Sequence, residues 1–264
     1  MVSNRQTLAA SSELSLFPLD IVVSDLDVIV ELGQCTNAVP RGDDTNSHLL
    51  ADLSVAQPYG IPIVAPTNRV PEKLVSFSEA VGIPNPDPTA YVHFYENEDK
   101  IIRFWRQPEK YLPLLNGFAG LIGCDLSVYR DMEPAVKIYN TYRNFLLTAW
   151  PQSKGIAAIA NVRLSGLESI DYALAGVPRE STLAIGLNGC TKDHENRSHV
   201  FEEVRLICDY CKPTALVCYG SDRYGVLDYP KECGIPVYLF KPDSYRRSKD
   251  RCQPKVGGKY EQAA

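Results

Sequence analysis

The sequence predicts an α/β fold whose mostly parallel sheet is built from repeated βα units and is barrel-like or a degenerate barrel. Short strand-like apolar runs alternate with helical stretches from about residue 89 to residue 241, which is the pattern of βα units. Seven such runs occur in order along a chain of 264 residues. That number and that length suit a (β/α) barrel slightly better than an open doubly wound sheet, which stays the alternative.

Each expected element follows from local composition. The strand-like runs cover residues 61–66, 91–95, 120–129, 156–163, 182–188, 215–219 and 236–240. Helices are expected at residues 100–115, with a break near Pro108, and at 133–150, 167–174 and 198–211. Asp131 is the expected N-cap of the second helix, and Pro134 suits its first turn.

The chain is expected to have three regions. Residues 1–88 form an irregular N-terminal segment that packs on the body, and the run Ile83-Pro-Asn-Pro-Asp-Pro marks the break after it. Residues 89–241 form the βα body. Residues 242–264 form a basic tail that we expect to be flexible.

Charge is unevenly distributed along the chain. The formal net charge is −5, which speaks against a protein that coats nucleic acid with its whole surface. From Lys241 onward seven basic residues face three acidic ones, a net charge of +4, so the remainder carries −9. Without a binding role, this tail is simply a solvated terminus. With one, residues 242–264 make a weak contact with nucleic acid or an acidic partner.

The sequence favours a cytoplasmic protein. The first thirteen residues lack an apolar run of signal-peptide length, and no apolar run is long enough to cross a bilayer, so no membrane contact is expected. Among the eight cysteines, Cys124 and Cys218 lie inside apolar strand-like runs, as reduced cysteines do.

No metal site is predicted, and the cofactor, if one exists, stays unknown. Cys208 and Cys211 have the spacing of a zinc or redox pair, but they continue the helical apolar pattern of Phe201, Val204 and Ile207, and no second close pair of ligands is evident. The sequence also lacks the GxGxxG and GxxxxGK[ST] phosphate-binding turns. Dinucleotide-binding and P-loop functions are therefore disfavoured.

Polar residues at the ends of four consecutive expected strands are the main functional signal. In both parallel architectures, ligands bind beyond the carboxyl ends of the strands. The candidates there are Asp125, Asn161, Arg163, Asn188 and Tyr219. We expect Arg163 to clamp an anion, the two asparagine amides to orient it, and Asp125 to act as a base or metal ligand. Strand ends also meet water in proteins without a site, so a purely structural interpretation stays open.

Two further segments could contribute to this site. Asn140, Arg143 and Asn144 share one face of the second expected helix, where Arg143 either pairs with Asp125 or Asp131 in a buried salt link or binds phosphate together with Asn140. His194 lies in the loop after the strand of residues 182–188 and is a candidate catalytic acid or base. Helix capping by Asn196 or Ser198 would explain part of that loop instead. His93, inside a strand, is expected to be a core histidine.

Several short motifs resemble one known family. They are Asp125-Leu-Ser-Val-Tyr followed by Asp131-Met, Asn140-Thr-Tyr-Arg-Asn, Gln152 with Gly155, Asn188-Gly-Cys, and Tyr219-Gly. Together they resemble the domain-of-unknown-function family 4417, over about residues 91–221. The resemblance implies an origin in a bacterium, phage or mobile element, and it implies no activity. If the gene belongs to a phage, the expected location is the host cytoplasm.

Two functional hypotheses follow, and whether the protein is an enzyme stays open. The first is an intracellular enzyme or binding protein that acts on a small polar or phosphorylated ligand at the carboxyl ends of the strands. The second is a non-catalytic interaction protein that uses the basic tail. A structural role in a phage particle is a third alternative.

Overall fold

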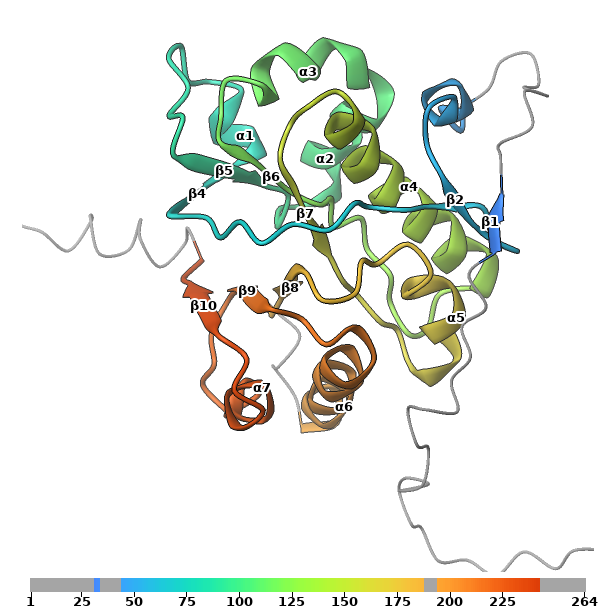
Figure 1. The fold of residues 1–264 in the computed structure, drawn as a ribbon, viewed down its shortest axis with the longest axis vertical. Coiled ribbons are helices and arrows are strands. Elements are labelled where there is room, and N and C mark those ends of the chain that lie inside the picture. Colours follow the sequence, from blue (N-terminus) through green and yellow to red (C-terminus); the bar gives the residue numbers. More distant parts are fainter. Residues whose placement is uncertain (1–30, 34–43, 188–193, 243–264) are drawn as a thin grey trace, which may run out of the picture.

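A seven-stranded parallel sheet forms the centre of the molecule. A computed structural model describes residues 31–33, 44–187 and 194–242. The sheet has the order β4-β5-β6-β7-β8-β9-β10, and every neighbouring pair is parallel (Figure 1). Its strands are β4 (Lys73–Ser76), β5 (Ala90–His93), β6 (Gly120–Ile122), β7 (Ala158–Asn161), β8 (Thr182–Gly186), β9 (Ala215–Tyr219) and β10 (Val237–Phe240).

The sheet curls into a nearly closed barrel with one open seam, between β4 and β10. Spatial order equals chain order throughout, without the reversal that defines a doubly wound sheet. The predicted α/β class is therefore confirmed in its barrel-like form.

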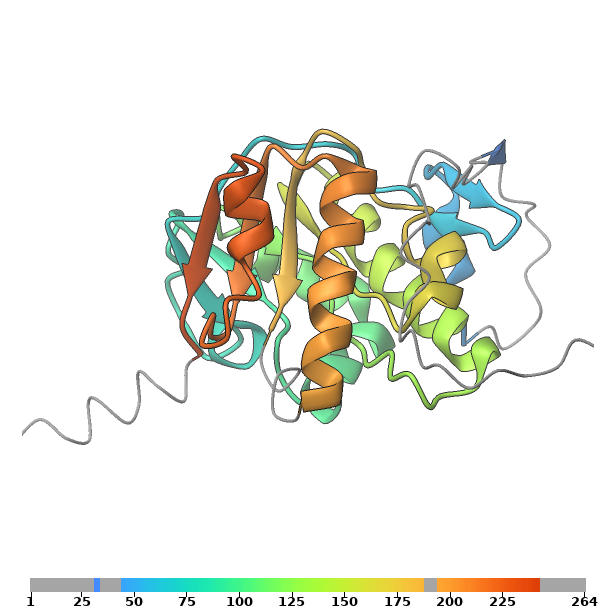
Figure 2. The ribbon, with the colours of Figure 1, turned by 90° about the horizontal axis from the view of Figure 1, so that it is seen from below.

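Helices follow the strands and cover the outside of the barrel, as α6 does beside β8 in Figure 2. They are α1 (Phe77–Ala80), α2 (Glu98–Arg106), α3 (Pro108–Leu115), α4 (Pro134–Ser153), the 3-10 turn η3 (Leu167–Ser169), α5 (Ile170–Ala173), α6 (His194–Cys211) and α7 (Asp228–Glu232). The expected break at Pro108 separates α2 from α3, and Pro134 begins α4. The expected N-cap Asp131 is wrong, because the chain enters α4 through Glu133 in extended conformation.

Apolar side chains pack both inside and outside the barrel. Tyr91, Ile122, Ile159 and Val217 belong to the cluster that the strands enclose, and two larger clusters fill the space between sheet and helices. Burying each large side chain contributes about 1.5–3 kcal/mol, so these layers hold the strand ends in place.

Cys208 and Cys211 lie in the outer layer on the buried face of α6. Burial raises the pKa of each thiol to about 12, so both are protonated at neutral pH. Their expected role as helix core residues is confirmed.

The sequence predicts a barrel strand at residues 61–66, and this prediction is wrong. Ile61 and Pro62 form β3, which pairs antiparallel with β2 (Val55–Gln57) in a small sheet that also contains β1 (Glu31–Gly33), next to the turn η2 (Ser47–Leu50). The seventh barrel strand is instead β4, which pairs with β5. Although β4 lies within residues 1–88 and joins the sheet, the division of the chain at residue 88 stays a prediction.

Between β3 and β4 the chain runs across the amino ends of the strands, and we call residues 64–70 the strap. Figure 1 shows the strap passing in front of the sheet. The Thr67 oxygen accepts a hydrogen bond from Thr182 N–H at 2.7 Å, and Ser181 Oγ accepts one from Thr67 N–H at 2.9 Å. Thr214 Oγ1 lies 3.2 Å from Asn68 Oδ1. The strap therefore covers the amino ends of β8 and β9.

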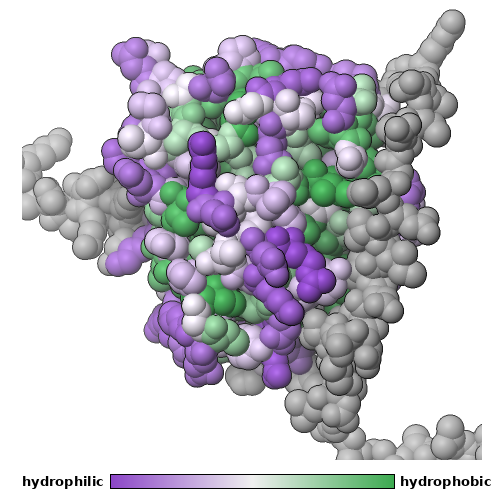
Figure 3. Space-filling view, in the orientation of Figure 1, coloured by the Kyte–Doolittle hydropathy of each residue, from purple (hydrophilic) through white to green (hydrophobic). Residues whose placement is uncertain are grey.

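The face seen in Figure 3 is mixed in hydropathy, because hydrophilic side chains lie between separate smaller apolar areas. In the described part of the chain, no helix is long and apolar enough to span a bilayer.

Candidate functional site

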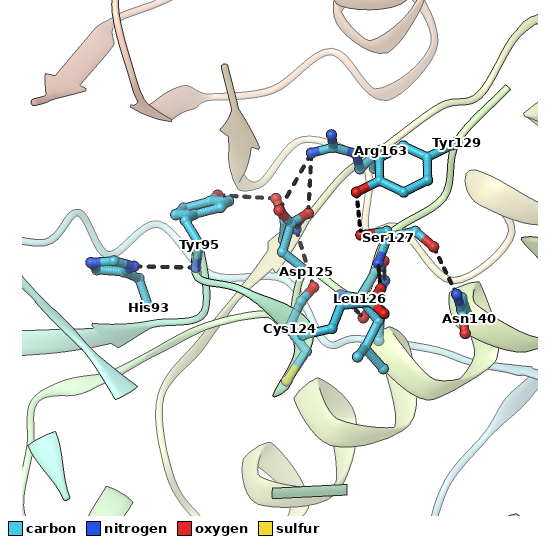
Figure 4. A network of polar contacts seen from close by, with 12 residues as sticks. His93, Tyr95, Cys124, Asp125, Leu126, Ser127, Tyr129, Asn140 and Arg163 are labelled. Atoms are coloured by element: carbon cyan, nitrogen blue, oxygen red, sulfur yellow. Dashed lines mark hydrogen bonds and ion pairs between the residues drawn. The ribbon is translucent and has the colours of Figure 1, made fainter. Parts of the chain in front are cut away.

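Three of the expected site residues meet at the carboxyl ends of β6 and β7. Asp125 follows β6, Asn161 ends β7, and Arg163 lies two residues further on. Arg163 Nη1 lies 3.3 Å from Asp125 Oδ1 and 3.4 Å from Oδ2. Asn161 Nδ2 donates to the same Asp125 Oδ1 at 3.0 Å and to the Cys124 carbonyl oxygen at 3.1 Å. The carboxylate is thus held between a cation and an amide (Figure 4).

Tyr95 fixes the orientation of the Asn161 amide. Its hydroxyl donates to Asn161 Oδ1 at 3.0 Å, so the amide nitrogen faces Asp125. Burial raises the pKa of Tyr95 well above its usual value, and the phenol therefore keeps its proton. Hydrogen bonds run in one direction, from Tyr95 through Asn161 to Asp125.

Stacked aromatic rings lie beneath this network. The ring centroids of Tyr95 and Tyr219 are 4.9 Å apart, and those of His93 and Tyr219 are 4.5 Å apart. His93 is fully buried, and its Nδ1 accepts the Tyr95 backbone N–H at 3.2 Å, which confirms the expected core histidine. Gly186 makes room for the stack, because a Cβ there would lie 2.7 Å from the Tyr95 ring. We call Tyr95, Asp125, Asn161, Arg163 and Tyr219 the rim site.

The polar face of α4 holds the loop that carries Asp125. Asn144 Oδ1 accepts the Leu126 N–H at 2.8 Å, and its Nδ2 donates to the Leu126 oxygen at 3.0 Å, as a neighbouring strand would. Asn140 Nδ2 donates to the Ser127 oxygen at 2.7 Å. From the other side, Glu98 accepts the Ser127 N–H at 2.6 Å. These contacts position the loop, and a direct ligand contact by Asn140 stays a prediction.

Arg143, also on α4, lies against aromatic rings from α2 and α4. Its guanidinium carbon is 4.8 Å from the Trp105 ring centroid and 5.3 Å from that of Tyr139, and its Nη1 donates to Asn140 Oδ1 at 3.1 Å. Within the described residues no carboxylate pairs with Arg143, so the expected salt link to Asp125 or Asp131 is wrong. Asp125 pairs with Arg163 instead, because the neighbouring strand brings that guanidinium closer. Burial lowers the pKa of Arg143, and its phosphate-binding role stays a prediction.

Nothing in the sequence singles out one partly buried carboxyl group, that of Glu203 in α6. Its pKa is influenced by the charges of Arg130, Arg163 and Glu168 and by the Gly166 backbone. Burial raises the pKa of Glu203 to about 7, and the two arginines offset only part of that effect.

The sequence gives little signal for Glu203 or Tyr95. Glu203 lies in the run Phe-Glu-Glu-Val-Arg, which is typical of a solvated helix face, and Tyr95 lies past the end of β5 in an apolar run. Alternation along the strand could have placed Tyr95 on the face of His93, and therefore near the rim.

The remaining expected residues are only partly described. His194 is the first residue of α6, but its side chain lies outside the described residues, as does the whole of Asn188. Residues 243–264, which make up nearly all of the basic tail, also lie outside them. The catalytic role of His194, the orienting role of Asn188 and the nucleic-acid contact of the tail stay predictions.

The described residues include no group of three or more His, Cys, Asp or Glu side chains arranged to hold a metal ion. Cys124, Cys208, Cys211, Cys218 and Cys233 are free thiols. The side chains of the rim site are an arginine, one carboxylate, one amide and two phenols.

Comparison with known proteins agrees with the resemblance seen in the motifs. A family model described as "Domain of unknown function (DUF4417)" matches residues 53–231, which include the rim site and Glu203. The chain is 27% identical over 186 residues to the Gene 1 protein of Mycobacterium phage D29, covering 68% of this chain and 67% of that one. It is 26% identical over 186 residues to the Gene 1 protein of Mycobacterium phage L5, covering 68% and 80%. No solved structure matches the chain significantly.

Proposed function

The chain belongs to the DUF4417 family and has phage relatives, and from this premise we propose a function for the rim site. The rim site binds a small polar or phosphorylated ligand at the carboxyl ends of the parallel strands. The protein acts as an enzyme or as a binding protein. The observation that carries the proposal is the directed network of Tyr95, Asn161, Asp125 and Arg163 above an aromatic floor. It lies where parallel barrels bind their ligands.

The contact between Arg163 and Asp125 suits a site that opens for an anion. Its distances of 3.3 and 3.4 Å exceed the about 2.7–2.9 Å of a strong charge-assisted hydrogen bond. The two side chains are 22% and 16% exposed, so solvent reaches both. A phosphoryl or carboxylate group can therefore take the place of Asp125 beside the guanidinium. Once displaced, the Asp125 carboxylate is available to accept a proton from the ligand.

Asn161 and the aromatic floor supply orientation. Because Tyr95 and the Cys124 carbonyl fix the Asn161 amide, this group cannot turn to follow a misplaced ligand. The Tyr95 and Tyr219 rings are buried and stacked on each other, so they support the polar network from below. A small ligand with one anionic group fits this combination.

Ligand-induced thermal stabilisation of the full chain tests the proposal. The probes are inorganic phosphate, pyrophosphate, nucleoside phosphates and sugar phosphates. We expect at least one probe to raise the melting temperature of the wild type, and Arg163→Ala to weaken its binding about tenfold or more, since hydrogen bonds to charged groups contribute about 1.5–3 kcal/mol. Lys154→Ala, which removes the cation of an exposed pair with Asp52, is the matched control and should bind as the wild type does.

Two further results complete the test. Urea unfolding shows whether Arg163→Ala is folded, and Arg163→Lys, which keeps the charge but not the planar fork, replaces it if it is not. If no probe stabilises the wild type, or if both Arg163 variants bind normally, the proposal is wrong. Asp125→Asn distinguishes an enzyme from a binding protein. If the protein is an enzyme, this variant should still bind the probe but no longer turn it over.

A further inference from the structure

Two arginines and a tyrosine meet at the same end of the sheet as the rim site, after the next two strands. Arg197 lies in the first turn of α6, which follows β8, and Arg223 and Tyr224 lie in the loop after β9. The guanidinium carbon of Arg197 is 3.8 Å from the Tyr224 ring centroid, and that of Arg223 is 5.7 Å from it. One ring therefore holds two positive charges near each other. We call these three residues the arginine cluster.

The positive charge of the arginine cluster is not neutralised within the described residues, where no carboxylate forms an ion pair with Arg197 or Arg223. Asp222, next to Arg223 in sequence, binds other groups: Oδ2 lies 2.6 Å from Lys231 Nζ, and Oδ1 accepts the Leu227 N–H at 3.0 Å. Arg197 Nε is buried and has no hydrogen-bond partner in the described part of the chain. An aromatic ring attracts a cation through its quadrupole and brings no opposite charge. The cluster is thus oriented for an anion without being paired with one.

The arginine cluster and Arg163 belong to one edge of the sheet. Arg163 follows β7, and its Nη1 lies 3.6 Å from the position that a Cβ of Gly186, in β8, would take. Gly186 pairs with Tyr219, the last residue of β9 before the loop that carries Arg223. Neighbouring strands are about 4.8 Å apart, so a separation of two strands is about 10 Å. One phosphoryl group cannot span that distance, whereas a ligand with two separated phosphoryl groups can.

We propose that the arginine cluster is a second anion-binding subsite of the rim, and that the ligand carries two phosphoryl groups, one at Arg163 and one at the cluster. A guanidinium stacked by its face keeps its N–H edge for such a group, which it can bind through two parallel hydrogen bonds. A small bisphosphorylated molecule and a short single-stranded nucleic acid share this chemistry. The inference rests on the proposed function and adds the second half of its ligand.

Calorimetry of the full chain with two pairs of ligands tests the second subsite. One pair is fructose 6-phosphate and fructose 1,6-bisphosphate, and the other is thymidine 5′-phosphate and the 5′-phosphorylated thymidine dinucleotide. In at least one pair, we expect the ligand with two phosphoryl groups to bind about tenfold more tightly or better, because its second group binds without a further loss of translational freedom. The pair with the larger gain identifies the source of the ligand.

Variants of the arginine cluster should lose this gain. Arg197→Ala and Arg223→Ala should each remove most of it and leave the affinity for the ligand with one phosphoryl group within about twofold of the wild type, whereas Arg163→Ala should weaken both ligands. Arg197→Lys, which keeps the charge but not the planar group, replaces Arg197→Ala if that variant does not fold. Arg179→Ala is the matched control, because Arg179 lies over the Tyr210 ring at 5.1 Å, but before the amino end of β8.

The outcomes separate the second subsite from the proposed function. If the wild type binds both members of each pair equally, or if the gain survives in both cluster variants, the second subsite is wrong and the Arg163 site stands. If Arg179→Ala loses the gain as well, the net charge of the protein attracts the second group, and the second subsite is again wrong. If none of the four ligands binds, the anion-binding function itself is wrong, and the second subsite with it.

Discussion

Side chains of the rim site are each held in one orientation, because a hydrogen bond from a neighbouring side chain excludes the alternative orientations. Tyr95 can only donate to Asn161, which then presents its amide nitrogen to Asp125. Such a chain is sensitive to the loss of any member, since a buried polar group that loses its partner costs about 1–3 kcal/mol.

The raised pKa of Glu203 has its own consequence for stability. The folded protein holds this proton up to about pH 7, whereas an unfolded glutamate loses it near 4.5. The stabilising contribution is therefore fully present below about pH 4.5 and is lost as the pH rises to about 7. We expect the free energy of unfolding of the wild type to fall relative to Glu203→Gln over that window, by about 3 kcal/mol or less.

Urea unfolding of both proteins at several pH values between 4.5 and 8 measures this difference. Glu202→Gln, which removes the neighbouring carboxylate of α6, serves as the reference and should follow the wild type. A constant difference between the wild type and Glu203→Gln across the window would show that the Glu203 proton is not held by the fold.

At the scale of elements, α4 determines where the rim site can form, because its asparagines hold the loop after β6. Asn144→Ala leaves the Leu126 N–H and carbonyl group without their partner. We expect it to lower the free energy of unfolding by about 2–4 kcal/mol and to speed amide exchange in residues 124–128. Asn116→Ala, at an exposed asparagine after α3, should do neither. Unchanged exchange in the loop would contradict the positioning role of Asn144.

How far the sequence predicts these elements depends on their length and burial. Residues 215–219 are predicted to the residue, because β9 is buried throughout and bounded by polar turns. In contrast β4 is missed: it has four residues, begins at an exposed lysine and follows an irregular stretch. The expected strand at residues 61–66 is reduced to Ile61–Pro62 at the edge of the small sheet, and its prolines cannot reveal which sheet it joins.

The same contrast holds for the site. Asp125, Asn161 and Arg163 could be found from the sequence, because the carboxyl ends of adjacent parallel strands meet at one edge. Glu203 could not, because it approaches Arg163 from the middle of a helix, and helical spacing alone does not reveal which loop a helix face contacts. The partner of Arg143 was missed because aromatic rings from α2 and α4 replace the carboxylate that charge alone suggests.

For the whole molecule, the strap connects the two sides of the open seam. It binds the amino ends of β8 and β9 and then leads into β4, on the other side of the seam. Ser181 Oγ both accepts the Thr67 N–H and lies 3.0 Å from the Thr67 oxygen, to which it donates.

Ser181→Ala tests the strap. It should lower the free energy of unfolding by about 1–2 kcal/mol and speed exchange of the Thr67 amide more than exchange in β5 to β7. Hydrogen exchange followed by mass spectrometry measures both regions at once. Ser153→Ala, at the exposed end of α4, is the matched control. Exchange that rises equally everywhere would mean that the strap is not a separate stabilising contact.

The strap also bears on the order in which the protein assembles during synthesis. Its hydrogen-bond partners Ser181 and Thr214 lie 114 and 146 residues after Thr67 and Asn68 along the chain. Contacts between such distant residues form slowly, because a long loop must close before they contribute. The strap is synthesised early but cannot dock until β8 and β9 have been synthesised. The surroundings of β4 are therefore complete only when the last third of the barrel has been made. A chain paused on the ribosome between these two points would have β4 paired with β5 but its strap still undocked.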